Sequence, residues 1–411
     1  MPGSAGGGRA GSRMAADLAP PAPAGRNAHP QFDAAEFALR IERLRARLRA
    51  AGVDVGLFDE IEAMTWLAGY GNSENRWRCV AIPVTGDPFF LIRALDAGPC
   101  RERTWIDEVV AFRDWDDPLP VLAGLLQSRG LERARIGLDF GSYCMPAARL
   151  ERLRAAVPQA ALIDVGAVVA ELRLIKSPAE IALLRRAAAI ADEALRRAAA
   201  ACTVGSTQRD ALGAAASTMI ALGGDPGAPG PISAGQQWDF LHAHLREGPL
   251  AAGDVVHIEV TPRVAGYGAR LMRCVSVGPP STALIDAAGR LRDLQDRQIA
   301  ALRPRALAGD VDAILRDGVL GQGLRDSFDN ITGYTLGLYA HAGPRTSDFT
   351  RIFHPGARWS VEAGMVFHMY ASAQGASFSE SVLVTDAGPE RLTQLPRALI
   401  VNSNGRLSHD H

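Results

Sequence analysis

The sequence has almost no net charge, because its 44 basic and 45 acidic side chains leave a formal charge of −1. Such a chain lacks the excess positive charge by which proteins bind nucleic acids or anionic membrane surfaces. It also contains no run of about eighteen apolar residues, so the sequence predicts no membrane-spanning helix. We therefore expect no nucleic-acid and no membrane partner.

Cysteines are few and widely spaced, at positions 79, 100, 144, 202 and 274. Their number is odd, and no two have the close spacing that is typical of a zinc or redox motif. This pattern predicts free thiols in a cytoplasmic protein.

The chain, at 411 residues, is longer than one hydrophobic core usually accommodates, which favours two domains. Its first 30 residues are rich in Gly, Ala and Pro and lack the apolar core of a signal peptide, so we expect a disordered leader. Beyond it we expect an N-terminal domain over 34–168, a second domain over 172–400 and a tail over 401–411.

The N-terminal part alternates between helical and strand patterns. An amphipathic stretch at 34–51 predicts a helix, and helical stretches also occur near 117–129 and 146–156. Short β-branched or aromatic runs predict strands at 53–58, 79–84, 88–92, 135–140 and 161–166. This alternation is typical of an α/β domain.

The second part begins with a long helix. Ser177 is a favourable N-cap, Pro178 suits the first helical position, and Glu180 completes a capping box. Another helix is expected at 207–222, and the chain from 250 onward predicts strands with helices near 282–303 and 309–323. The overall class is therefore α/β of the α+β type.

One predicted hairpin, over 256–273, carries an acid on one arm and a base on the other. Two β-branched runs flank a Pro/Gly turn, with Glu259 before the turn and Arg270 after it. Opposite charges at matching places predict a cross-strand ion pair, since a buried charge without a partner is costly.

Several segments, in the right order, resemble the creatinase/aminopeptidase P family, whose catalytic domain has the pita-bread fold. They are RLIKSPAEI at 173–181, PLAAGDVV at 249–256, GYTLGLYAHAGP at 333–344, VEAGMVF at 361–367 and SVLVT at 381–385. The resemblance covers roughly residues 35–395 and implies a creatinase-like N-terminal α/β domain followed by a pita-bread domain.

Metallopeptidases of this family bind two divalent ions through two Asp, one His and two Glu. By register with the family's motifs, these places hold Glu259, Arg270, Tyr334, Tyr370 and Ser379, with Glu380 one residue from the last place. A guanidinium does not give up its proton and repels a metal ion. The resemblance therefore implies a member with no metal site and no cofactor.

Two histidines outside the family's metal-ligand set are retained, His242 and His341, and His244 competes with His242 for its place. This combination resembles creatinase, which cleaves a C–N bond without metal and uses a histidine as proton acceptor for water. It implies that His242 is the general base and that His341 stabilises a substrate carbonyl or oxyanion.

The residues at the former ligand places have two readings. Arg270, held by Glu259, either binds a carboxylate or carbonyl of the substrate or only fills the vacated metal site. Tyr334 and Tyr370 either orient the substrate or occupy the volume of the missing ions. Glu380 is kept as a further substrate-binding candidate, because a one-residue shift would place it in the last ligand position.

The segment NRWRCVAI at 75–82 resembles a creatinase segment whose arginine reaches into the partner subunit's pocket. The resemblance places Arg76 in that role. It implies a homodimer in which each N-terminal domain lies near the partner's active site.

Three functions compete. The first is a metal-independent hydrolase of a non-peptide C–N bond in a small amidino, guanidino or amide metabolite that carries a carboxylate. The second is a catalytically inactive binding protein on a peptidase-like scaffold, and the third is an Xaa-Pro aminopeptidase-type metallopeptidase. Fold alone does not separate them.

Overall fold

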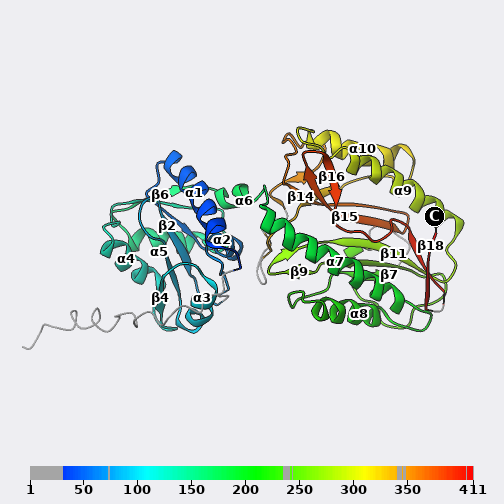
Figure 1. Ribbon diagram of the computed structural model, residues 1–411, viewed down its shortest axis with the longest axis horizontal. Coiled ribbons are helices and arrows are strands. Elements are labelled where there is room, and N and C mark those ends of the chain that lie inside the picture. The colour runs from blue at the N-terminus through cyan, green and yellow to red at the C-terminus, as the bar shows by residue number, and fades with distance from the viewer. Residues whose placement is uncertain are drawn as a thin grey trace, which may run out of the picture. The chain divides into compact units, whose positions relative to one another are not determined.

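The computed structural model describes residues 31–72, 75–234, 241–242, 244–339, 345, 349–403 and 405–410 (Figure 1). The expected leader at 1–30 lies outside the described residues. The chain forms two compact units: the first comprises 31–60 and Leu67–Asp164, and the second comprises Ile61–Trp66 and the chain from Val165 onward.

The first unit is built on a mixed six-stranded sheet in the order β4-β3-β2-β1-β5-β6. The five predicted strands form, and the sheet gains a short edge strand, β4, whose sequence pattern is weak because only two of its five residues are buried. The strands are β1 (Val55–Phe58), β2 (Cys79–Pro83), β3 (Phe89–Arg93), β4 (Glu108–Phe112), β5 (Arg135–Leu138) and β6 (Ala161–Asp164).

Helices flank this sheet, and their apolar faces complete its core. The three helices that the sequence predicted in this unit are confirmed. Asp33 caps the first of them by accepting a hydrogen bond from the Glu36 main-chain N–H. The helices are α1 (Ala34–Ala50), α3 (Ala97–Arg103), α4 (Pro118–Ser128), α5 (Ala147–Ala156) and a 3₁₀ turn, η1 (Ala94–Asp96); α2 (Ile61–Ala68) contributes to both units.

The second unit contains a ten-stranded, mostly antiparallel sheet. Its main path is β13-β12-β14-β15-β11-β17-β18, with β16 beside β15, β8 beside β11 and β7 beside β8. The strands are β7 (Ile232–Ala234), β8 (Val255–Val260), β11 (Leu271–Val277), β12 (Gly333–Thr335), β13 (Ile352–Phe353), β14 (Val366–Ala373), β15 (Ala376–Thr385), β16 (Gly388–Arg391), β17 (Leu399–Ser403) and β18 (Arg406–Asp410).

The segment beyond residue 400, which we expected to be a tail, is part of this sheet. Strands β17 and β18 pair as an antiparallel hairpin, from Leu399 opposite Asp410 to Ser403 opposite Arg406. The Gly405 main-chain N–H donates to the Asn402 side chain across the turn. An Asn-Gly pair between two β-like runs is a strong hairpin signal, so the sequence carried the information that corrects this boundary.

Two helix pairs pack against the sheet of the second unit (Figure 1). In the view, α9 and α10 lie at the top of this unit, α8 lies at its bottom, and α7 crosses the unit between them. The bounds are α6 (Val168–Leu172), α7 (Pro178–Ala201), α8 (Gln208–Ala221), α9 (Thr282–Ala300) and α10 (Ala308–Gly321), so the four long predicted helices are confirmed.

The start of α7 is tied to two distant parts of the unit. Ser177 and Glu180 form the predicted capping box, in which each side chain accepts a hydrogen bond from the other residue's main-chain N–H. Glu180 also accepts hydrogen bonds from the Trp66 indole at 3.0 Å and from the Tyr267 hydroxyl at 2.7 Å. A single carboxylate therefore joins α7, α2 and the hairpin that precedes β11.

All five cysteines are free thiols, as predicted. Within the described part of the chain, no helix is long and apolar enough to cross a membrane.

Candidate active site

The hairpin with the acid and the base forms by antiparallel pairing of β8 and β11, in which Glu259 lies opposite Met272. Its expected simple turn contains a small ribbon of two short strands, β9 (Arg263–Val264) and β10 (Tyr267–Gly268). Arg270 immediately precedes β11. The Ser381 hydroxyl of β15 bonds both its main-chain N–H and its carbonyl, at 2.9 and 3.0 Å, which fixes the backbone from which the guanidinium extends.

The predicted ion pair forms inside the unit. Arg270 Nη1 lies 3.1 Å from Glu259 Oε1 and donates a second hydrogen bond of 2.6 Å to the Tyr334 hydroxyl. Glu259 and Arg270 are only 4% and 7% exposed, so water screens their attraction weakly. The guanidinium also lies over the Tyr334 ring, 5.3 Å from its centroid, where a cation is attracted by the ring face.

Strand register brings the remaining former ligand positions to the same face of the sheet. Met272 pairs with both Glu259 and Ser379, and Ser379 pairs with Tyr370 on the next strand. The rings of Tyr334 and Tyr370 are 5.9 Å apart in an edge-to-face arrangement. Directly opposed residues point to the same face of a sheet. The side chains at the five former ligand places therefore converge: Glu259, Arg270, Tyr334, Tyr370 and Ser379.

Glu380 does not belong to this group, which corrects its place among the substrate-binding candidates. As the neighbour of Ser379 along β15, its side chain points to the opposite face of the sheet. There its carboxylate accepts hydrogen bonds from Arg273 at 2.7 Å and Arg397 at 3.0 Å, and one from the Thr393 hydroxyl. The strand register therefore excludes the one-residue shift that would put Glu380 in the last ligand place, which Ser379 holds. Glu380 instead belongs to a buried hydrogen-bond network on the other face.

The converged residues do not fit a pair of divalent metal ions. The set offers one carboxylate, two phenols, one hydroxyl and a guanidinium, and the guanidinium hydrogen-bonds the carboxylate that would have to bind metal. A dinuclear site needs several anionic or imidazole ligands to offset about four positive charges. No cluster of three or more His, Cys, Asp or Glu side chains within the described residues is arranged to hold a metal ion.

The histidines expected to act in catalysis are only partly described. His242 and His244 are both exposed, and His341 lies outside the described residues. Burial, together with the nearby imidazole of His242, lowers the pKa of His257 to about 3. His257 stands two residues before Glu259 on β8 and is hydrogen-bonded to the Ser377 hydroxyl at 2.8 Å.

Sequence reasoning missed a further histidine on this face, His368 of β14. It lies opposite Tyr334 and is 2% exposed. Its ring contacts Tyr334 edge-on at 5.1 Å between centroids and stacks on Tyr370 at 5.4 Å. Strand alternation along FHMY offered a signal, because His368 shares the face of Tyr370 whenever 366–373 is a strand.

Tyr370 is itself held in a polar setting. The Asn330 side chain donates a 3.3 Å hydrogen bond to its hydroxyl and accepts one of 3.0 Å from Arg325. Burial raises the pKa of Tyr370 above its usual range, so the hydroxyl stays protonated at neutral pH and can donate a hydrogen bond.

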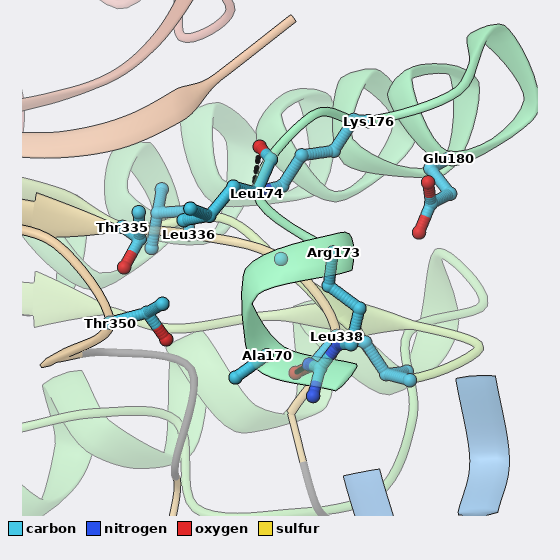
Figure 2. A pocket seen from close by; sticks show the side chains of 10 residues that line it. Ala170, Arg173, Leu174, Lys176, Glu180, Thr335, Leu336, Leu338 and Thr350 are labelled. Carbon is cyan, nitrogen blue, oxygen red and sulfur yellow. Dashed lines mark hydrogen bonds between the residues drawn. The ribbon is translucent and has the colours of Figure 1, made fainter. Parts of the chain in front are cut away.

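A small cavity lies beside the segment that follows Tyr334 (Figure 2). Its volume of about 10 Å³ suits roughly one water molecule, and Lys176, Glu180 and Thr335 are among the side chains that line it. Lys176 Nζ donates to the Leu174 carbonyl at 3.0 Å, which is the dashed line in Figure 2. Burial lowers the pKa of this ammonium to about 7.

Arg76, the residue expected to reach a partner subunit, lies in the first unit. Its guanidinium donates to the main-chain carbonyl of Asp114. It lines a hollow of about 290 Å³ together with Trp115, Arg149 and Arg152. The role across a dimer interface stays a prediction.

Known proteins resemble both parts of the chain. A family model described as Metallopeptidase family M24 matches residues 182–386, and one described as Creatinase/Prolidase N-terminal domain matches residues 40–175. Ectoine hydrolase of Halomonas elongata is 25% identical over 394 residues, which cover 90% of this chain and 98% of that protein.

Solved structures share the architecture. The crystal structure of dipeptidase PepE from Mycobacterium ulcerans is 25% identical, with a TM-score of 0.76 over 90% of this chain and 99% of that one. Xaa-Pro dipeptidase from Bacillus anthracis is 21% identical, with a TM-score of 0.77 over 89% of this chain and all of that one. At that identity the second likeness establishes the fold alone.

Proposed function

This chain belongs to the creatinase/aminopeptidase P family of hydrolases, and on that premise we propose that it hydrolyses a non-peptide C–N bond in a small nitrogenous metabolite without a metal ion. The proposed substrate is an amidino, guanidino or amide compound that carries a carboxylate.

One observation supports the proposal above the others: the guanidinium of Arg270 bonds Glu259 and Tyr334 where the family's metallopeptidases hold their ions. A fixed cation there can bind a substrate carboxylate or polarise a carbonyl, which are tasks that a metal ion performs elsewhere in the family. Glu259 keeps the guanidinium in place. The hydroxyls of Tyr334 and Tyr370 add hydrogen-bonding groups on the same face.

The proposed base is His242. Its imidazole takes a proton from water while the water oxygen attacks the carbon of the C–N bond. The bond then breaks, and the imidazolium returns the proton to the departing nitrogen, so that one water molecule is consumed and the enzyme is restored. His341 is proposed to stabilise the oxyanion, and Arg76 of a second subunit is proposed to complete the site in a homodimer.

The relative named for ectoine hydrolysis supports the substrate class, because its similarity extends over both parts of the chain. Ectoine is a cyclic amidine that carries a carboxylate, so it combines the two groups that the proposed site would recognise. Ectoine and creatine, a carboxylated guanidine, are therefore suitable probes. The Xaa-Pro dipeptide Ala-Pro with manganese tests the peptidase alternative, which the 25%-identical dipeptidase PepE favours.

We predict that the purified protein contains less than about 0.2 equivalents of tightly bound divalent metal, because its donor set does not neutralise such ions. Elemental analysis measures this directly, and the same sample is used for turnover of ectoine, creatine and Ala-Pro with and without manganese. About two metal ions per chain, or manganese-dependent cleavage of Ala-Pro alone, would overturn the proposal. A protein that turns over no probe but retains a protein partner in affinity capture would favour the inactive scaffold.

We further predict that His242→Ala lowers kcat by about 100- to 10,000-fold on any probe that is turned over, because a positioned general base contributes on that order. His244→Ala is the matched control and should change kcat less than threefold. Undiminished turnover in His242→Ala together with loss in His244→Ala would transfer the role of base to His244. Undiminished turnover in both would reject a histidine of this segment as base.

A further inference from the structure

Two polar side chains on the face of the proposed site are buried without any hydrogen-bond partner among the described residues: the His368 ring, at both nitrogens, and the Ser379 hydroxyl. Strand pairing places them beside the other site residues, since His368 lies opposite Tyr334 and Ser379 lies opposite Tyr370. Buried polar groups in native proteins are nearly always hydrogen-bonded, so each of these two calls for a physical reason.

The contrast with His257 shows what a structural histidine looks like on this same face. His257 is also fully buried, but its Nδ1 is hydrogen-bonded to the Ser377 hydroxyl at 2.8 Å. The position opposite His368 on β15 is Ser381, whose hydroxyl is instead used by the main chain of Arg270. Among the described residues, the His368 ring is therefore held by packing between Tyr334 and Tyr370 and by no hydrogen bond.

The His368 ring is also kept uncharged. Burial is the main cause that lowers its pKa well below the ordinary value, and the positive charges of Arg270 and Arg345 add to it. A neutral imidazole has one N–H donor and one nitrogen acceptor, and a serine hydroxyl can serve as either. The face thus combines one fixed cation with neutral groups able to donate and to accept hydrogen bonds.

We propose that His368 and Ser379 are substrate-binding residues that hydrogen-bond the planar N–C–N or N–C=O group of the substrate while Arg270 holds its carboxylate. This assignment rests on the proposed function and specifies its substrate: a small molecule in which a planar group with both donor and acceptor atoms lies near an anionic group. Ligand binding then satisfies two polar side chains that have no hydrogen-bond partner among the described residues.

The test exploits the opposite effects that binding and structural roles have on stability. His368→Phe keeps an aromatic ring between Tyr334 and Tyr370 and removes both ring nitrogens. It should leave the melting temperature unchanged or raise it, because a buried group without a partner opposes folding. The matched control, His257→Phe, breaks a hydrogen bond on the same face and should lower the melting temperature by several degrees.

Binding is measured by titrating each variant with the probe that stabilises the wild-type protein among ectoine, creatine and Ala-Pro with manganese. His368→Phe should weaken this binding about 10- to 100-fold, and Ser379→Ala should weaken it about 5- to 10-fold, since each removes hydrogen bonds to the ligand. Ser379→Ala removes only a hydroxyl, so it carries the binding test if His368→Phe fails to fold.

The outcomes separate this inference from the proposed function. Unchanged affinity in both variants, or a loss of melting temperature in His368→Phe equal to that in His257→Phe, overturns the inference. Binding of Ala-Pro with manganese alone overturns the proposed function, and the His368→Phe affinity for that dipeptide then decides the inference. If no probe binds, the proposed substrate class fails, and the comparison of melting temperatures alone decides whether His368 is held for a ligand.

Discussion

Replacing Arg270 by methionine is expected to lower the free energy of unfolding by about 3–5 kcal/mol, as is typical when one partner of a buried ion pair is removed. Glu259, only 4% exposed, would be left as a charge without its guanidinium. The Tyr334 hydroxyl would lose its 2.6 Å hydrogen bond from the same nitrogen. Urea unfolding of the variant and the wild-type protein, followed side by side at pH 7, measures the difference.

Two further variants show whether the loss comes from the unpaired charge. Adding Glu259→Gln to Arg270→Met removes the stranded carboxylate and should recover most of the lost stability, so the double-mutant cycle should give a coupling of about 2–3 kcal/mol. Arg113→Met breaks an ion pair with Asp116 in which the arginine is 56% exposed, so water screens the pair and the urea midpoint should change far less than it does in Arg270→Met. A loss below about 1 kcal/mol for Arg270→Met would mean that Glu259 is not held by this arginine.

The same substitution should abolish turnover of any carboxylated substrate, but stability and function need separate measurement here. The Arg270 side chain links Glu259 of β8 to Tyr334 of β12, so its loss changes both the site and the sheet. His368→Phe differs in this respect, because it is expected to change binding without lowering stability. Together the two variants distinguish a residue that stabilises the folded site, Arg270, from one that only binds the substrate, His368.

The sequence predicted most of the fold because most elements have a strong period or a recognisable boundary. The helix from Pro178 begins where its capping box requires, and the α1 amphipathic pattern gives a helix with Phe37, Ile41, Leu44 and Leu48 buried. The ion pair of Glu259 and Arg270 could also be predicted, since burial of one charge on a hairpin demands the other nearby.

Predictions failed where they depended on pairing between distant strands. Glu380 was one residue from a plausible ligand position, yet a shift of one residue along a strand moves a side chain to the other face. Only the register of β15 against β14 and β11 settles which face it takes. His368 escaped notice for the same reason, because its neighbours across the sheet are Tyr334 and Ser381, which are distant in sequence.

Lys176 is a residue whose environment no local pattern revealed, although it is the single lysine of the chain. Lys176 is 7% exposed, and burial lowers the pKa of its amine from 10.5 to about 7. Between those two pH values the unfolded chain binds a proton that the folded chain does not. Folding stability should therefore fall as the pH decreases from about 10.5 to about 7 and should not fall further from this cause below that.

Replacing Lys176 by methionine should remove this dependence on pH. At about 1.4 kcal/mol per pKa unit, the lowered pKa corresponds to a penalty on the order of 5 kcal/mol at pH 7, against which loss of the hydrogen bond to the Leu174 carbonyl costs about 1–3 kcal/mol. Lys176→Met should thus be more stable than the wild-type protein at pH 7, with the advantage reversing near pH 10.5.

Lys176→Arg is the opposing control, because a guanidinium stays charged at both pH values. Gly337 packs closely against Lys176, since a β-carbon added at Gly337 would lie only 3.3 Å from Lys176 Cε. The larger guanidinium would therefore crowd Gly337 as well. This variant should therefore be less stable than the wild-type protein throughout. Urea midpoints of the three proteins between pH 7 and 10.5 decide the matter, and parallel curves for lysine and methionine would show that the amine is charged in the folded protein.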